Sequence, residues 1–220
     1  MLKVEKCEKI SSFNEGELCL DFVNTVDWRF SEKRKKETLH DFFDVISWVK
    51  QEGILEDETV QKIIITASKQ LDKVNLIYKK TIELRELLHR IFSSIATTGQ
   101  ASTKNISLFN HLLADSLGKS CCVTPSGNGF VWAFSSAIDS IDLFLNPIIK
   151  SAADFLVSPN LKRLKQCADE QCGWLFIDKS RNNSRRWCSM NDCGNRAKAH
   201  RHYERKIQRK KIRNYKTGKT

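Results

Sequence analysis

The feature that most constrains this chain is a group of four cysteines within 27 residues near its C-terminal end. They form two pairs, Cys167 with Cys172 and Cys188 with Cys193; four residues lie between the members of each pair and fifteen between the pairs. Two such pairs, separated by the length of a hairpin, can bring four sulfur atoms to one point, as tetrahedral zinc requires. The spacing therefore predicts one structural zinc ion with no open position for catalysis.

Disulfide bonding is the other common use of cysteines, and the N-terminal sequence argues against it. MLKVEKCEKI lacks the apolar stretch and the small-residue cleavage site of a signal peptide. No apolar run approaches the roughly 20 residues that a membrane span needs. We therefore expect a cytoplasmic protein without a membrane partner, in which clustered cysteines bind metal more often than they pair with one another.

Positive charge is concentrated at the same end of the chain as the clustered cysteines. Residues 161–220 hold 18 Lys and Arg against 5 Asp and Glu, a net of +13; the whole chain carries +11, so residues 1–160 carry −2. Such asymmetry is typical of a near-neutral domain joined to a module that binds a polyanion. The Ser-Pro-Asn sequence at 158–160 predicts a boundary between a domain at 1–158 and a module at 159–220.

The apolar periodicity of residues 1–158 predicts a mainly helical domain with a small β-hairpin, so the expected fold class is α+β. Two β-type runs at 121–124 and 130–134 flank the turn-forming sequence PSGNG and predict the hairpin. Helices are expected over residues 16–28, 39–55, 57–70, 74–96, 106–117 and 136–158, the last of them kinked at Pro147.

The module at 159–220 is expected to fold in the order knuckle, β-hairpin and basic helix, which is a treble-clef-like zinc finger. CADEQC at 167–172 supplies the knuckle, GWLFID at 173–178 a first strand, and RRWC at 185–188 the returning strand. A helix is expected from about residue 193, with the second cysteine pair at its start.

The segment 167–206 resembles the CGNR-type zinc finger, which is named for the tetrapeptide present here at 193–196. LCLDFVNT at 18–25 resembles the opening of the ABATE domain, which precedes this finger in a family of bacterial stress-induced transcription regulators. The resemblance implies that the chain is a DNA-binding regulator. It also implies the zinc ligands, which are Cys167, Cys172, Cys188 and Cys193.

Seven basic side chains of the finger are expected to contact nucleic acid. They are Arg181, Arg185 and Arg186 before the helix and Lys198, Arg201, Arg205 and Arg209 along it. The four on the helix lie within about 80° of arc, and the apolar residues at 199, 203 and 207 lie on the other side, where we expect them to pack on the hairpin. Double-stranded DNA is the expected partner. An RNA-binding or ribosome-associated protein is the alternative, because charge and zinc alone do not separate the two.

Four further residues have expected roles. Asn195 and Arg196 are interpreted as a structural brace for the zinc cluster rather than as base-reading residues. Asp21 and Asn24 are near one another around a helix axis and are candidates for a polar pocket that binds a small effector; the alternative is that they satisfy buried backbone groups. A single finger offers a small footprint on DNA, which favours either a homodimer or a second contact surface. Since the sequence contains no phosphate-binding glycine loop, nucleophile elbow or second metal cluster, we do not expect an enzyme.

Overall fold

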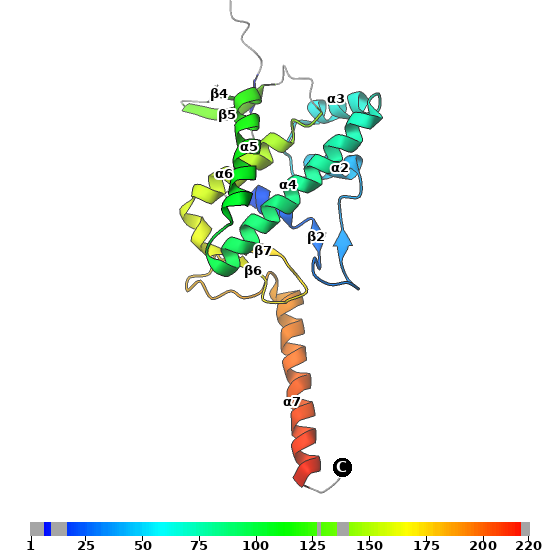
Figure 1. The fold of residues 1–220 in the computed structure, drawn as a ribbon, viewed down its shortest axis with the longest axis vertical. Coiled ribbons are helices and arrows are strands. Elements are labelled where there is room, and N and C mark those ends of the chain that lie inside the picture. The colour runs from blue at the N-terminus through cyan, green and yellow to red at the C-terminus, as the bar shows by residue number, and fades with distance from the viewer. Residues whose placement is uncertain (1–6, 10–16, 127–128, 136–140, 217–220) are drawn as a thin grey trace, which may run out of the picture.

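The structure, a computed structural model, describes residues 7–9, 17–126, 129–135 and 141–216. Figure 1 shows a helical body from which a long helix projects. The helices of the body are α1 (Glu17–Val23), α2 (Phe42–Gln51), α3 (Asp57–Ala67), α4 (Leu71–Thr98), α5 (Thr103–Ser120) and α6 (Leu145–Val157). They confirm the expected α+β fold class with a mainly helical N-terminal domain. Among the described residues, no helix combines the length and the apolarity that crossing a bilayer requires.

The strands are short and antiparallel. β1 (Cys7–Lys9), β5 (Gly129–Ser135) and β4 (Cys121–Ser126) form one sheet in the order β1-β5-β4. The β4-β5 hairpin confirms the one that the sequence predicted. Two more ribbons pair β2 (Val26–Asp27) with β3 (Lys36–Glu37) and β6 (Leu164–Gln166) with β7 (Leu175–Ile177).

α2 follows directly from its sequence. The carboxylate of Asp41 accepts hydrogen bonds from the backbone N–H groups of Phe43 and Asp44, at 2.8 and 2.9 Å, and so caps the start of the helix. Gly53 lies just beyond the end with a φ of 64°, a conformation that glycine adopts without a steric penalty. The helix predicted over residues 39–55 is confirmed, with its ends at Phe42 and Gln51.

Four helices are shorter than predicted, namely α1, α2, α3 and α6. α1 ends at Val23, and the chain then enters β2 instead of continuing as a helix to Trp28, whose φ of 51° is left-handed. α6 begins at Leu145, so the prediction of a longer helix kinked at Pro147 is wrong for residues 141–144, which form turns. Pro147 is in the first helical turn, where its missing N–H has no helical acceptor to lose. Residues 136–140 of that prediction lie outside the described residues.

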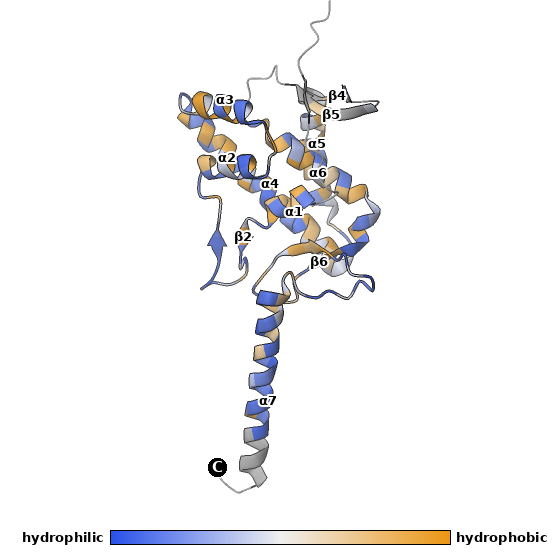
Figure 2. Cartoon of the chain, turned by 180° about the vertical axis from the view of Figure 1, so that it is seen from behind, coloured by the Kyte–Doolittle hydropathy of each residue, from blue (hydrophilic) through white to orange (hydrophobic). Residues whose placement is uncertain are grey.

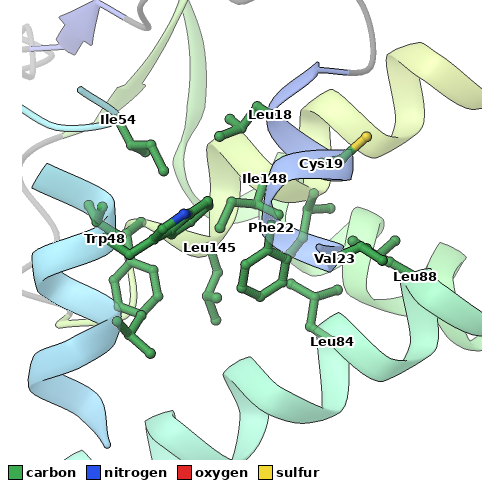
Figure 3. Close-up of a cluster of buried hydrophobic side chains, with 14 of the residues drawn as sticks. Leu18, Cys19, Phe22, Val23, Trp48, Ile54, Leu84, Leu88, Leu145 and Ile148 are labelled. Carbon is green, nitrogen blue, oxygen red and sulfur yellow. The ribbon is translucent and has the colours of Figure 1, made fainter. Parts of the chain in front are cut away.

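α1 is at the centre of the core (Figure 3). Its sequence, ELCLDFV, is apolar on most sides, so the short helix is buried by several neighbours at once. Phe22 stacks at a tilt on Trp48 of α2, with ring centroids 5.4 Å apart. Leu84 and Leu88 of α4 and Leu145 and Ile148 of α6 belong to the same cluster. Burial raises the pKa of Cys19 to about 12, so this thiol stays protonated and packs as an apolar group.

A network of ion pairs ties α4 to the segment that leaves α1. Arg85, whose side chain is 2% exposed, donates to both carboxylate oxygens of Glu37, at 2.6 and 2.7 Å. Glu86 accepts from Arg85 at 3.1 Å and from Arg29 at 2.6 Å. Burial by itself would raise the pKa of Glu37, but the hydrogen bonds and charge of Arg85, together with the backbone N–H groups of Leu39 and Thr38, outweigh it and hold that pKa below its usual value. Residues 29–37 are therefore held against the helical body.

We expect Glu37→Gln to lower the free energy of unfolding by about 1 to 3 kcal/mol at pH 7, because Arg85 stays buried with a weakened partner. The effect should shrink as the pH falls through the depressed pKa of Glu37, since the carboxylate contributes stability only while it is ionised. Urea denaturation checks both statements. Glu58→Gln is the matched control: its pair with Lys62 is exposed, so it should cost less than about 0.5 kcal/mol. Equal losses for the two variants would contradict the assignment.

Candidate metal centre and nucleic-acid interface

The finger begins with a ribbon whose strands lie on either side of the knuckle. β6 pairs antiparallel with β7, with Leu164 opposite Ile177 and Gln166 opposite Leu175, and the first cysteine pair lies in the turn between them. The hairpin therefore forms from a strand before the knuckle. The prediction that RRWC returns as the second strand is wrong, because residues 185–188 are irregular.

Asp178 explains why that segment does not join a ladder. Its carboxylate, which is fully buried, accepts hydrogen bonds from Lys165 Nζ at 2.7 Å, Ser180 N at 2.8 Å and Arg185 N at 2.7 Å. These bonds outweigh the cost of burial and lower the pKa of Asp178. Because a side chain takes the N–H of Arg185, and Lys165 Nζ donates to its carbonyl at 3.2 Å, the backbone has no need of a neighbouring strand. Sequence reasoning missed Asp178, whose only signal is its place before a polar turn.

The structure brings the four predicted zinc ligands together. The Sγ atoms of Cys167, Cys172, Cys188 and Cys193 all lie within 4.8 Å of one another. Sγ of Cys188 is 3.6 Å from that of Cys172 and 3.5 Å from that of Cys193. A tetrahedron with Zn–S bonds of about 2.3 Å has S–S edges of about 3.8 Å, whereas a disulfide requires about 2.05 Å. The cluster therefore fits one structural zinc ion held by four sulfurs.

The thiols of the cluster share their protons unevenly. Hydrogen bonds from Cys172 and Cys188 lower the pKa of Cys167, and the same contacts with Cys167 raise the pKa of the other two. Burial raises the pKa of Cys193. A zinc ion takes the place of these protons, since a coordinating thiol is deprotonated outright. Zinc is thus the group that allows four closely spaced thiolates to coexist.

Arg196 lies against the cluster. Its guanidinium is 3.4 Å from Sγ of Cys193 and donates to the carboxylate of Asp169 at 3.1 Å, while it stacks on the ring of Trp28 with 3.8 Å to the ring centroid. Asn195 donates from Nδ2 to the carbonyl of Asn191 at 3.2 Å. These contacts are what the bracing role requires of the two residues, and that role stays a prediction.

Gly194, the glycine of the CGNR sequence, lies close to Met190 and Trp187. A Cβ at Gly194 would come within 2.9 Å of Sδ of Met190 and within 3.4 Å of the ring of Trp187. Gly194 also lies in the π-helical turn Met190–Gly194, which carries Cys193 into the start of α7 (Asn195–Lys216). A side chain at this position would displace the end of the Met190 side chain, which is exposed.

α7 leaves the finger after its first turn and projects away from the body (Figures 1 and 2). The basic side chains of α7 that are predicted to contact nucleic acid are exposed; they are Lys198, Arg201, Arg205 and Arg209. The opposite side is exposed as well: Tyr203 is 62% and Ile207 38% accessible. The prediction that this side packs on the hairpin is wrong, because the hairpin ends near the metal cluster and nothing in the described body reaches further along the helix.

The three basic residues before α7 differ in their surroundings. Arg181 and Arg186 are exposed. Arg185 is also exposed, but its guanidinium donates to the carbonyl of Trp187 at 2.9 Å and to that of Cys188, and it lies over the ring of Phe176. Arg185 therefore supports the loop that carries Cys188, and contact of the three with nucleic acid stays a prediction.

Asp21 and Asn24 do not line either of the cavities described here. Asn24 instead joins α1 to β7: its Nδ2 donates to the carbonyl of Leu175 at 2.9 Å, and its Oδ1 accepts from the N–H of Leu175 at 3.0 Å. The alternative role, satisfying backbone groups, is therefore the one that the structure gives to Asn24. Asp21 is exposed on α1.

A cavity of about 820 Å³ lies elsewhere in the helical domain, between α4, α5 and the start of α6. Its apolar wall includes Leu84, Leu108 and Leu112, and charged side chains such as Arg90 and Asp142 line its edge. Its volume is within the range of small-molecule sites. A second cavity, of about 420 Å³, lies beside the start of α5.

Sequence reasoning missed the contact between the knuckle and the helical domain. The backbone N–H groups of Arg29 and Phe30 donate to the carbonyls of Cys172 at 3.0 Å and Gln171 at 3.2 Å. Gly173, with a φ of 76°, closes this contact, because a Cβ there would lie 2.9 Å from Cβ of Arg29. Beneath it His89, which is buried, has Nε2 3.4 Å from the carbonyl oxygen of Gly173. The backbone of one zinc ligand, Cys172, is thus hydrogen-bonded directly to backbone that belongs to the helical domain.

Cys188→Ser should reduce zinc from one ion per chain to well below one, since three thiolates and a hydroxyl bind zinc far more weakly than four thiolates. Structural zinc contributes about 10 to 16 kcal/mol in finger peptides, so the finger should lose its cooperative unfolding. Elemental analysis and thermal denaturation measure the two effects. Ser189→Ala, next to the ligand but outside the cluster, should retain zinc. Full zinc content in Cys188→Ser would overturn the assignment.

Burial and the positive charge of Arg29 lower the pKa of His89 to about 4, from an ordinary value of 6.5. As the pH falls, the unfolded chain therefore takes up a proton at this residue before the folded chain does. The contribution of neutral His89 to the free energy of unfolding is complete above pH 6.5 and is lost progressively down to about pH 4. At pH 5 the loss from His89 should be about 2 kcal/mol. Urea denaturation at pH 7.5 and pH 5 should show this loss in the wild type and in His111→Gln, an exposed control, but not in His89→Gln. If the free energies of unfolding of the two variants fell equally between pH 7.5 and pH 5, this role of His89 would be refuted.

Comparison with known families agrees with this geometry. Residues 163–206 match the family of the CGNR zinc finger, and residues 16–159 match the ABATE family, described as "Putative stress-induced transcription regulator". The two matches have the order that the sequence resemblance implied, and neither family is an enzyme family. A search of curated proteins found no match. Because the ABATE match covers more than half of the chain, the protein belongs to the ABATE family and carries a C-terminal CGNR zinc finger.

Proposed function

We propose that the protein regulates transcription by binding double-stranded DNA, with α7 as its main contact. The observation that carries this proposal is the exposure of a basic helix that is fixed only at its first turn. α7 holds ten Lys and Arg and one Glu in 22 residues. A helix with so many positive charges does not contribute to the hydrophobic core of this chain. The negatively charged phosphates of a nucleic acid are the partner whose charge complements it.

The zinc centre supports the proposal by giving α7 a defined direction. The π-helical turn that contains Cys193 runs straight into Asn195, so the metal cluster and the first turn of the helix move together. A helix held rigidly at one end loses less conformational entropy on binding than a free basic tail does. Its exposed sides allow it to enter a groove with phosphates on both flanks.

The shape of α7 favours DNA over RNA. The major groove of B-form DNA is about 12 Å wide and admits an α-helix, which is about 10 to 12 Å across with its side chains. The major groove of A-form RNA is too narrow for this, so a protein reads RNA through single strands or the wide minor groove. Double-stranded DNA is therefore the partner that we propose, and RNA is the alternative.

A homodimer and a bound effector complete the proposal. Tyr203 and Ile207 lie exposed on the less basic side of α7 and offer apolar contacts to a second copy.

The cavity bordered by Leu108 and Leu112 has the volume and apolar wall that an effector site needs, whereas Asp21 and Asn24 do not border it. Native mass spectrometry of the full chain tests both the homodimer and the bound effector, because dimerisation and a retained small molecule change the measured mass by different amounts.

Replacing Lys198, Arg205 and Arg209 with Gln should weaken binding to a duplex by at least tenfold at 0.1 M salt. The slope of log K against log salt should fall by about 2 to 3, since each phosphate contact contributes about 0.9. Fluorescence anisotropy between 50 and 200 mM salt measures both quantities. The control is a triple Lys→Gln variant at the exposed residues Lys69, Lys73 and Lys79, far from α7 (Figure 1). Salt-independent retention, or tighter binding to structured RNA than to the duplex, would refute the proposal.

A further inference from the structure

The segment that joins β2 to β3 in the helical domain carries a second concentration of positive charge. Its sequence at 32–36 is EKRKK, and all five side chains are exposed. The acid that follows, Glu37, is turned inward and paired with Arg85, so its charge does not offset the lysines. Among the described residues, no ion pair engages Lys33, Lys35 or Lys36. The segment, here named the basic loop (residues 32–36), thus presents four cations and one acid to solvent.

The basic loop lies beside the start of α7. The guanidinium of Arg34, in the loop, is 4.2 Å from the ring centroid of Trp28, and the guanidinium of Arg196, in the first turn of α7, is 3.8 Å from the same centroid. The two guanidinium carbons are therefore no more than about 8 Å apart, which is one Debye length at physiological salt. In Figure 1 the loop and α7 lie at the same end of the body. Phosphates near the start of α7 therefore experience the charge of both elements.

The position of the loop is fixed by the contacts that dock the knuckle. Arg29 donates its backbone N–H to Cys172 and its guanidinium to Glu86, at 3.0 and 2.6 Å. The N–H of the buried Ser31 donates to the carbonyl of Trp28 at 2.8 Å, and the carbonyl of Ser31 accepts from the N–H of Lys35 at 3.0 Å. The bonds of Arg29 join the start of the loop to the knuckle, and the pair of Glu37 with Arg85 joins its other end to α4. The lysines consequently have a defined place relative to α7.

We propose that the basic loop of the helical domain is a second phosphate-binding element, which contacts the backbone of the same DNA duplex that α7 binds. This inference rests on the proposed function and deepens it, because the nucleic-acid surface then extends across both domains. The loop adds no base reading; it fixes how the duplex lies against the finger, as backbone contacts do. Trp28, between Arg34 and Arg196, positions the two halves of the surface.

The test replaces Lys33, Lys35 and Lys36 with Gln in the full-length, zinc-loaded chain. If the loop contacts phosphates, the slope of log K against log salt for a duplex should fall by about 2 to 3, and affinity at 0.1 M salt should fall at least tenfold. The triple variant at Lys69, Lys73 and Lys79 removes the same net charge far from α7. Comparison with it separates direct contacts from the long-range effect of net charge, and unchanged zinc content and thermal stability verify the fold.

The outcomes distinguish this inference from the function on which it rests. If the loop variant loses slope and affinity relative to the distant control, the inference holds. If the loop variant matches the control while the α7 variant loses affinity, the inference is overturned and DNA binding stands. If the wild-type chain fails to retain a duplex at any salt concentration, both are overturned.

Discussion

The convergence of four thiolates on one zinc ion is the interaction on which the functional half of this protein depends. The finger has a two-stranded ribbon of three residues each and a cluster of few buried side chains, too little apolar surface to fold by itself. The metal supplies the missing free energy and joins the knuckle to the turn that starts α7. The guanidinium of Arg196 lies 3.4 Å from Sγ of Cys193, where the predicted bracing role would place it.

The finger is also held from outside, through backbone that belongs to the helical domain. The bonds from residues 29–30 to the knuckle, the pair of bonds from Asn24 to Leu175, and the carbonyl of Gly173 over His89 form one contact surface. Beneath it the network of Arg29, Glu86, Arg85 and Glu37 fixes the same segment to α4. Disturbance of the metal site therefore reaches the helical domain through hydrogen bonds, and the direction of α7 is set by both domains together.

Much of the fold could be predicted because its signals are local. The amphipathic helix α2, the β4-β5 hairpin around its polar turn, and the paired cysteines each follow from residues close together in the chain. The predictions that failed concern segments whose structure depends on residues outside the local sequence pattern. RRWC has strand-like residues, but the buried carboxylate of Asp178 takes the N–H that a ladder would use. Helical periodicity suggested that the side of α7 with Tyr203 would pack, and within the described part of the chain no other surface extends that far along the helix.

The sequence by itself determined the zinc ligands, the mainly helical domain before them and the excess of positive charge at the C-terminal end. Spacing, periodicity and composition are properties of the chain, and they remain whatever the arrangement in space. Only the tertiary structure decided that Asn24 joins the two domains, that α7 projects freely, and that EKRKK lies beside the start of that helix. These outcomes depend on which surfaces meet, and residues more than 100 positions apart meet through packing and hydrogen bonds that no local pattern records.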